Sequence, residues 1–194
     1  MTLDLRKQVF DLDCYYGDRE DRLVHGEVIP FEGYRNNYSY WAKDVELPTL
    51  IRIEGFTVAL HETDFPHTSL EPVFTNRIWN CIRSFGAVDA EPIAVQFEDR
   101  LTQKITAGQH VYLHQMVFAD FFDRDASDYK ESKTIPGRIR VRHLVLDCPE
   151  NGFPPMFRIQ AARTKIFVNG EVKQALEAMG ATGMRFFPVE VSGN

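Results

Sequence analysis

The chain has 194 residues, of which 44% are hydrophobic, 26% charged and 12% aromatic, and its formal net charge is −6. This size and composition predict one globular domain that buries enough apolar surface to fold without a disulfide or a metal ion. The acidic balance argues against a general nucleic-acid binder and against an anionic membrane surface as partner, because both require a cationic face.

The N-terminal third predicts strands separated by long loops. Residues 7–16 alternate apolar and polar side chains, as a strand does. Residues 17–44 are polar and contain Tyr34 and Trp41, and we expect mostly loop there, with these rings as anchors. Residues 50–60 are apolar and β-branched, which predicts one or two short strands, and a turn-rich connector follows.

Two later segments, residues 73–95 and 166–189, share a strand–helix–strand pattern. Each begins with an apolar pair, continues with an Asn that we interpret as a helix N-cap, and closes its helix with a glycine. The helical spacing of apolar residues supports both helices. These positions are Asn76, Ile78, Ile82, Phe85 and Gly86 in the first segment, and Asn169, Val172, Leu176, Met179 and Gly180 in the second. Chance similarity between two capped helices is the competing explanation.

The remaining apolar blocks, at residues 109–122, 138–146 and 154–159, predict further strands. The block at 138–146 alternates basic and apolar side chains, which is typical of a half-exposed strand. Strands outnumber helices and do not alternate strictly with them. We therefore predict an α+β fold with a mixed or mostly antiparallel sheet and a few helices.

The three cysteines, Cys14, Cys81 and Cys148, are widely separated and form no CxxC pair, so we interpret them as free buried thiols. The N-terminus lacks the apolar stretch of a signal peptide, and no run approaches the ~20 apolar residues of a membrane span. We therefore expect a cytoplasmic protein without a membrane partner.

Two histidines are candidates for chemistry. His110 and His114 are four residues apart, so they share a face on a helix and also on a strand. No nearby Asp or Glu completes a metal site on the same element, and ordinary polar positions are the favoured interpretation. Nucleotide-binding loops, serine nucleophile elbows and zinc-binding helices have no matching motif in the sequence.

Acidic side chains cluster between residues 120 and 128. Four carboxylates in nine residues resemble a calcium loop, but the central glycine and closing Glu of an EF-hand are missing. A solvated acidic loop and an acidic patch facing a basic partner both remain open. A second cluster, at residues 18–21, has the same two interpretations. We predict no catalytic residue, cofactor or metal ion.

The C-terminal segment FRIQAARTKIFVNGEVKQALEAMGATGMRFFPV, residues 157–189, resembles the ending of the Myxococcus-type immunity domain of bacterial polymorphic toxin systems. A capped amphipathic helix is followed by the glycine, Thr-Gly and Arg-Phe run of that family. Residues 73–95 resemble its earlier strand–helix unit, and residues 112–129 resemble its central strand and Asp-rich turn. The resemblance covers residues 70–190. The family more often has Ser at the two cap positions, where this chain has Asn.

This resemblance implies a cytoplasmic immunity protein that neutralises a cognate secreted antibacterial toxin, most often a nuclease, by occluding its active site. It divides the single domain, 1–194, into a variable part, 1–65, and a family-like part, 66–194. A homo-oligomer is compatible with it. The alternative is a small enzyme or metal-binding protein that uses His110 and His114 or the acidic loop. We expect the toxin to be bound by acidic and aromatic side chains, namely Asp120, Asp123, Asp125, Asp128, Asp18, Glu20, Asp21, Tyr34 and Trp41.

Overall fold

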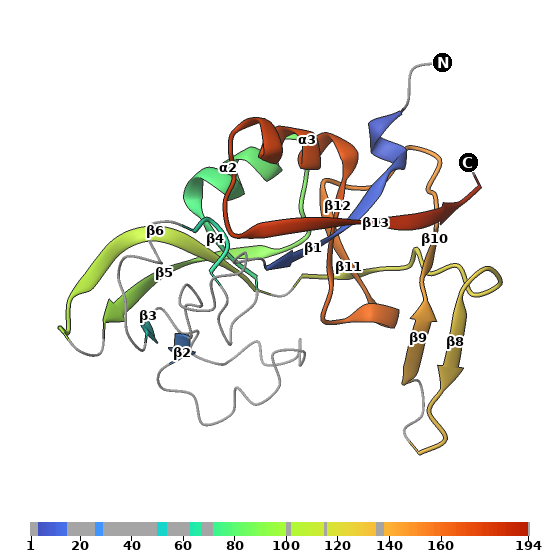
Figure 1. Ribbon diagram of the computed structural model, residues 1–194, viewed down its shortest axis with the longest axis horizontal. Coiled ribbons are helices and arrows are strands. Elements are labelled where there is room, and N and C mark those ends of the chain that lie inside the picture. Colours follow the sequence, from blue (N-terminus) through green and yellow to red (C-terminus); the bar gives the residue numbers. More distant parts are fainter. Residues whose placement is uncertain are drawn as a thin grey trace.

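The structure is a computed structural model that describes residues 4–14, 26–28, 50–53, 63–66, 72–99, 102–114, 116–134 and 138–193. Within these residues the chain forms two large β-sheets, a separate two-stranded sheet and two α-helices (Figure 1). The predicted α+β class with mostly antiparallel pairing is confirmed.

The six-stranded sheet is built around the N-terminal strand. Its order is β10-β13-β1-β12-β11-β7, and β1 is antiparallel to both of its neighbours, whereas β10 with β13 and β11 with β7 are parallel pairs. The bounds are β1 Val9–Cys14, β7 Phe118–Ala119, β10 Val145–Asp147, β11 Met156–Ile159, β12 Ile166–Asn169 and β13 Met184–Ser192.

The five-stranded sheet has the order β2-β3-β5-β6-β4. Only β3 and β5 pair in parallel, and a bulge interrupts the long β5–β6 ladder between Val95 and Phe97. The bounds are β2 Gly26–Val28, β3 Leu50–Ile53, β4 Val73–Thr75, β5 Glu91–Asp99 and β6 Ile105–His114.

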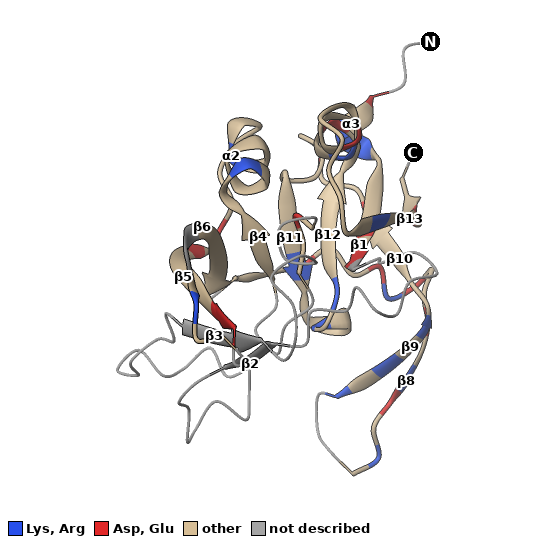
Figure 2. Ribbon diagram, turned by 60° about the vertical axis from the view of Figure 1, so that its left-hand side comes forward, with Lys and Arg blue, Asp and Glu red and all other residues tan. Residues whose placement is uncertain are grey.

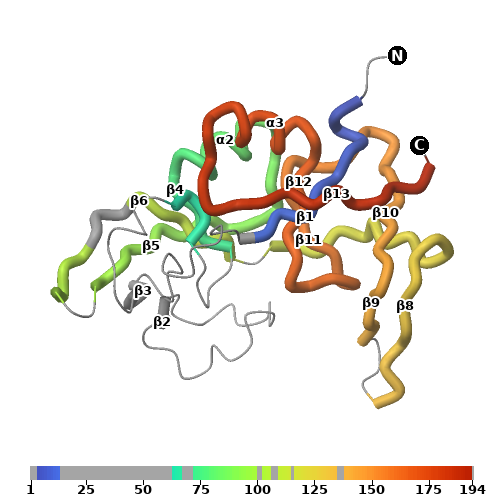
Figure 3. Tube along the Cα trace, viewed as in Figure 1, coloured from blue at the N-terminus to red at the C-terminus, as the bar shows by residue number. Residues whose placement is uncertain are grey.

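The two strand–helix–strand segments share one topology. In the first, α2 (Asn76–Ser84) connects β4 to β5, and β6 lies antiparallel between these strands. In the second, α3 (Gly170–Ala178) connects β12 to β13, and β1 lies antiparallel between them. Both helices lie on the same side of the molecule and contact each other (Figure 3). The expected strand–helix–strand unit therefore occurs twice.

The ends of α3 follow the predicted chemistry. Asn169 caps the helix by accepting a hydrogen bond from the Val172 N–H at 3.0 Å. Gly180, at φ +66°, closes it, and the Ala181 N–H donates to the Leu176 carbonyl at 3.0 Å. This 6→1 bond is the mark of a Schellman motif, which favours glycine at the left-handed position.

The ends of α2 differ from the prediction. Thr75, which is still extended at φ −63° and ψ 152°, is the N-cap, so Asn76 is the first helical residue and its assignment as a cap is wrong. The helix also ends one residue before Phe85, whose side chain is 40% exposed and does not continue the buried face of Ile78 and Ile82. The turn at Gly86 has φ +144°, outside the left-handed helical region.

Each face of the six-stranded sheet has its own apolar core, and β1 contributes to both. Leu12 packs with Leu176 and Ile78 in the core beneath the helices. Val9 packs on the other face with the stacked rings of Phe157 and Phe167. Residues 66–194 therefore do not build this sheet alone, since its central strand comes from the first 65 residues.

A buried carboxylate joins the two units. Asp64 is 4% exposed, and its oxygens accept hydrogen bonds from Arg77 Nε at 2.6 Å, Thr75 Oγ1 at 2.8 Å and the Thr182 N–H at 2.9 Å. Arg77 also donates through Nη2 to Asp64, and through Nη1 to the Met179 carbonyl at the end of α3. Burial alone would raise the pKa of Asp64. The hydrogen bonds from Arg77, Thr182 and Thr75 together have the larger effect, so the pKa of Asp64 is lowered.

Candidate partner-binding surface

The acidic turn, residues 120–128, follows β7 and is held by one of its own carboxylates. Asp123 Oδ1 accepts the N–H groups of Asp125 and Ala126, each at 2.9 Å, and the Asp123 N–H donates to the Val145 carbonyl at 3.1 Å. The Ser192 hydroxyl and these turn N–H groups lower the pKa of Asp123. Asp123 therefore fixes the shape of the turn, in addition to any role toward a partner.

The other three predicted carboxylates of the acidic turn point outward. Asp120 and Asp125 are exposed. Asp128 is the first residue of β8, and its Oδ2 lies 3.9 Å from Arg142 Nη1, with more than half of each side chain exposed. Ion pairs of this kind contribute little to stability, so Asp128 remains accessible.

A hairpin that we call the arm projects beside this turn. It consists of β8 (Asp128–Glu131) and β9 (Ile139–His143), which pair only with each other in the described part of the chain (Figure 1). Tyr129 lies opposite Val141, and Lys130 lies opposite Arg140. Because side chains alternate along a strand, one face of the arm is half-buried and the other is exposed and charged.

The base of the arm is fixed to the body. The rings of Phe122 and Tyr129 meet edge to face at 5.3 Å, and the Arg124 guanidinium lies over both rings. The Ser127 hydroxyl is 3.0 Å from the N–H and 3.1 Å from the carbonyl oxygen of Val145, the first residue of β10. An isolated hairpin is marginally stable in water, so these contacts are what hold the arm in place.

The acidic turn and the arm together carry charges of both signs. Residues 120–143 contain five Asp or Glu and six Lys or Arg side chains. The ribbon of Figure 2, coloured by residue type, has acidic and basic positions on adjacent parts of this region, with basic ones along β9. The surface therefore combines an acidic turn with a cationic strand, and a complementary partner needs patches of both signs.

A cleft lies between the arm and the six-stranded sheet. It has a volume of about 450 Å³ and is lined by two ion pairs, Asp11 with Lys165 and His143 Nε2 with Glu190 Oε2, the latter at 2.9 Å. Burial raises the pKa of Asp11, although the hydrogen bond from Lys165 counteracts this. No local sequence pattern predicts these pairs, because their members are 154 and 47 residues apart.

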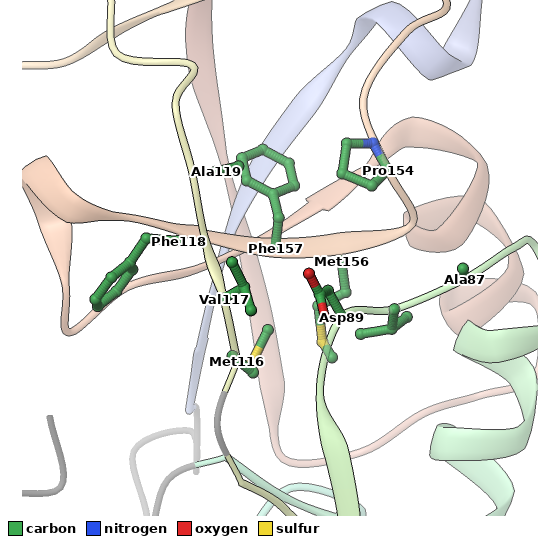
Figure 4. Close-up of a pocket in the computed structure, with 10 residues that line it drawn as sticks. Ala87, Asp89, Met116, Val117, Phe118, Ala119, Pro154, Met156 and Phe157 are labelled. Atoms are coloured by element: carbon green, nitrogen blue, oxygen red, sulfur yellow. The ribbon is translucent and has the colours of Figure 1, made fainter. Parts of the chain in front are cut away.

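A second hollow, of about 430 Å³, lies where residues 87–89 meet residues 116–119 (Figure 4). Its lining is almost wholly apolar and includes Val117, which is 54% exposed, and Phe157. Asp89 is its single titratable side chain. The hollow suits an apolar side chain better than acid–base chemistry, which needs positioned proton donors and acceptors.

The two candidate histidines lie on β6, and their side chains are buried to different extents. His110 is buried, and its ring meets Phe97 edge to face at 4.8 Å. His114 is half-buried, and its Nδ1 is 3.4 Å from the Tyr112 hydroxyl. Burial lowers the pKa of His114, with Glu91 opposing that shift. Among the described residues, no three His, Cys, Asp or Glu side chains are grouped to hold a metal ion.

Five predicted partner-binding residues lie outside the described part of the chain, namely Asp18, Glu20, Asp21, Tyr34 and Trp41. The described cysteines, Cys81 and Cys148, are half-buried free thiols, and burial raises the pKa of each. None of the helices that the structure describes has the length and apolar character to cross a membrane.

Compared with known proteins, the chain matches no protein-family model, and no curated protein is recognisably similar to it.

Proposed function

We propose that this chain is an immunity protein that binds a toxin protein and neutralises it by occluding the toxin's active site. The observation that carries the proposal is the surface formed by the acidic turn and the arm. This surface projects from the body, is held rigidly at its base and presents charges of both signs (Figure 2).

The arm contributes little to the stability of the chain that carries it. One of its faces is exposed, and within the described residues it pairs with neither large sheet. Ordering such a hairpin costs conformational entropy that its own contacts barely offset. A partner that covers the arm would supply the missing contacts, and a preformed surface loses less entropy on binding than a flexible one.

The exposed carboxylates of the acidic turn suit a cationic groove on the partner. Asp123 fixes the turn from within, so Asp120 and Asp125 are presented on a rigid support. Complementary charges of this kind accelerate association more than they add affinity. A nuclease is a fitting partner, because its substrate groove must attract phosphate groups. The resemblance of residues 70–190 to immunity domains supports a toxin as the partner.

Co-expression with the product of the neighbouring gene tests the proposal. We expect that product alone to arrest growth, and this chain to restore growth and to co-purify with it. A neighbouring product that is harmless, or one that remains toxic in the presence of this chain, would contradict the proposal.

The role of the acidic turn is tested by association kinetics with the purified toxin. The double variant Asp120→Asn/Asp125→Asn should associate about threefold to tenfold more slowly at low salt, with a weaker salt dependence. The matched control Glu150→Gln/Glu177→Gln removes two exposed carboxylates outside the turn and the arm and should leave the rate unchanged. Equal rates for both double variants would show that the turn does not steer association.

A further inference from the structure

The exposed face of the arm places two cations directly opposite each other. Lys130 of β8 is paired in register with Arg140 of β9. Opposed residues in an antiparallel pair have Cβ atoms about 4.5–5.5 Å apart, and like charges at that separation destabilise the pair. The arrangement is unfavourable for the arm by itself.

Two further cations lie on the same face. Arg138 is two residues from Arg140, so strand alternation places both on one side of the arm. The register shifts opposite Arg142, and that arginine is placed beside Asp128 by their ion pair. In the described part of the chain, the one ion pair made by these cations is that of Arg142 with Asp128, at 3.9 Å. An open hollow of about 610 Å³ is lined by Lys130, Arg138 and Arg140 together with one carboxylate, Glu131.

This concentration of positive charge runs against the character of the chain, whose net charge is −6. Among the described residues, Lys130, Arg138 and Arg140 have no ion-pair partner, and an anionic group across the exposed face would supply one. Arginine is also suited to this role, because its planar guanidinium binds a carboxylate through two parallel hydrogen bonds. The face therefore has the composition of an anion-binding surface.

We propose that this cationic face, formed by Lys130, Arg138, Arg140 and Arg142, binds an extended acidic segment of the partner protein that carries carboxylates at alternate positions. Arg138 and Arg140 are two residues apart on a strand, which is about 6.7 Å. Alternate side chains of an extended acidic segment have the same spacing, so each of these arginines meets one carboxylate, and Arg142 extends the face beyond them. The identity of the partner rests on the proposed function, whereas the chemistry of the cationic face does not depend on it.

Defined probes test the inference on the full-length chain. Three fluorescent probes carry four negative charges each: a peptide with glutamates at alternate positions, an isomer with the four glutamates contiguous, and a single-stranded DNA oligonucleotide. Anisotropy titrations at low salt should show saturable binding, tightest for the alternating peptide. The double variant Arg138→Ser/Arg140→Ser should weaken it at least tenfold, whereas the control Arg83→Ser/Lys104→Ser, which removes two exposed cations elsewhere, should change it less than twofold.

A second variant separates binding from folding. Lys130→Glu replaces the like-charge pair with an opposite-charge pair, so hydrogen exchange of the β8 and β9 amides should slow. The same variant should weaken binding of the alternating peptide at least fivefold. A loss of binding with improved protection cannot come from unfolding of the arm.

Three results would overturn the inference. They are absence of saturable binding, equal binding of the two peptide isomers, and tighter binding of the oligonucleotide with the same loss in the arginine double variant. The last would make the arm a nucleic-acid surface. These outcomes are independent of the co-expression result, because a chain that fails to neutralise its neighbour can still bind the alternating peptide, and the reverse also holds.

Discussion

Replacement of Asp64 by Asn should be among the most damaging conservative substitutions in the described chain. The carboxylate is 4% exposed and joins the start of α2 to the end of α3 through Arg77 and Thr182. An amide of the same size keeps one acceptor oxygen but turns an NH₂ group toward groups that are themselves donors. The change therefore removes the negative charge and places hydrogen-bond donors against one another.

The structure sets the size of the effect. Loss of one partner from a buried ion pair lowers the free energy of unfolding by about 3–5 kcal/mol when the remaining charge stays excluded from water. The Arg77 side chain is 47% exposed, so water stabilises its cation after the substitution. We therefore expect Asp64→Asn to lower the free energy of unfolding by about 2–4 kcal/mol. For a chain of this length the melting temperature should fall by roughly 5–15 °C.

The pH dependence provides an independent check on the same residue. The pKa of Asp64 lies below its ordinary value of 3.8, so the unfolded chain takes up this proton at a higher pH than the folded chain. The stabilisation is therefore complete at neutral pH, declines as the pH falls through 3.8 and is lost as the pH falls through the folded-state pKa. The stability difference between wild type and Asp64→Asn should shrink over that range.

Urea denaturation at pH 7 and at several values between pH 5 and 3 measures both effects. Asp128→Asn is the matched control, because it neutralises an exposed carboxylate whose partner, Arg142, is also exposed, and it should cost under about 1 kcal/mol. Equal losses for the two variants at pH 7, or a difference that does not change with pH, would refute the assignment of Asp64 as the buried link between the units.

Two further predictions concern the caps and turns of the helices. Asn169→Ala should lower the free energy of unfolding by about 2–3 kcal/mol, because the side chain caps α3 and also donates a hydrogen bond to the buried Phe153 carbonyl at 3.0 Å. Asn76→Ala changes an exposed first helical position and should lower it by less than about 0.5 kcal/mol. Equal losses of stability for the two variants would contradict the assignment of Asn169 as a cap and of Asn76 as a residue inside its helix. Gly183→Ala should cost more than about 3 kcal/mol, because φ is +76° and the added Cβ would clash with the Thr63 hydroxyl oxygen. Gly180→Ala, at φ +66° with open space around it, should cost about 1–2 kcal/mol. Thermal unfolding of the two asparagine variants and of the two glycine variants measures these differences. A smaller effect at Gly183 than at Gly180 would show that Gly183 does not approach Thr63 closely.

The sequence predicted the parts of the fold that depend on local signals. The strand at residues 9–14 and both helices follow from alternation and helical spacing, and capping chemistry predicts the start of α3 but not that of α2. The run at 138–146 was predicted as one strand, but the structure divides it at Leu144, because β9 pairs with β8 while β10 pairs with β13. Periodicity describes which side of a strand is apolar, and it contains no information about which strand lies alongside.

Long-range pairings of charged side chains were beyond sequence reasoning. Asp64 lies 118 residues before Thr182, and Lys165 lies 154 residues after Asp11, so no spacing rule connects them. The acidic turn was visible as a cluster of carboxylates, but the role of Asp123 inside the turn required its backbone partners. The alternating arginines were visible as well, and only the register with β8 revealed the pair of opposed cations.

Hydrogen exchange of the complex between this chain and the product of the neighbouring gene shows which surface the partner covers. We expect amides of the acidic turn and the arm, residues 120–134 and 138–143, to exchange more slowly on binding. The exposed faces of α2 and α3 should keep the exchange rates of the unbound chain. Protection confined to the helices, with residues 120–143 unchanged, would contradict the claim that this surface binds the partner.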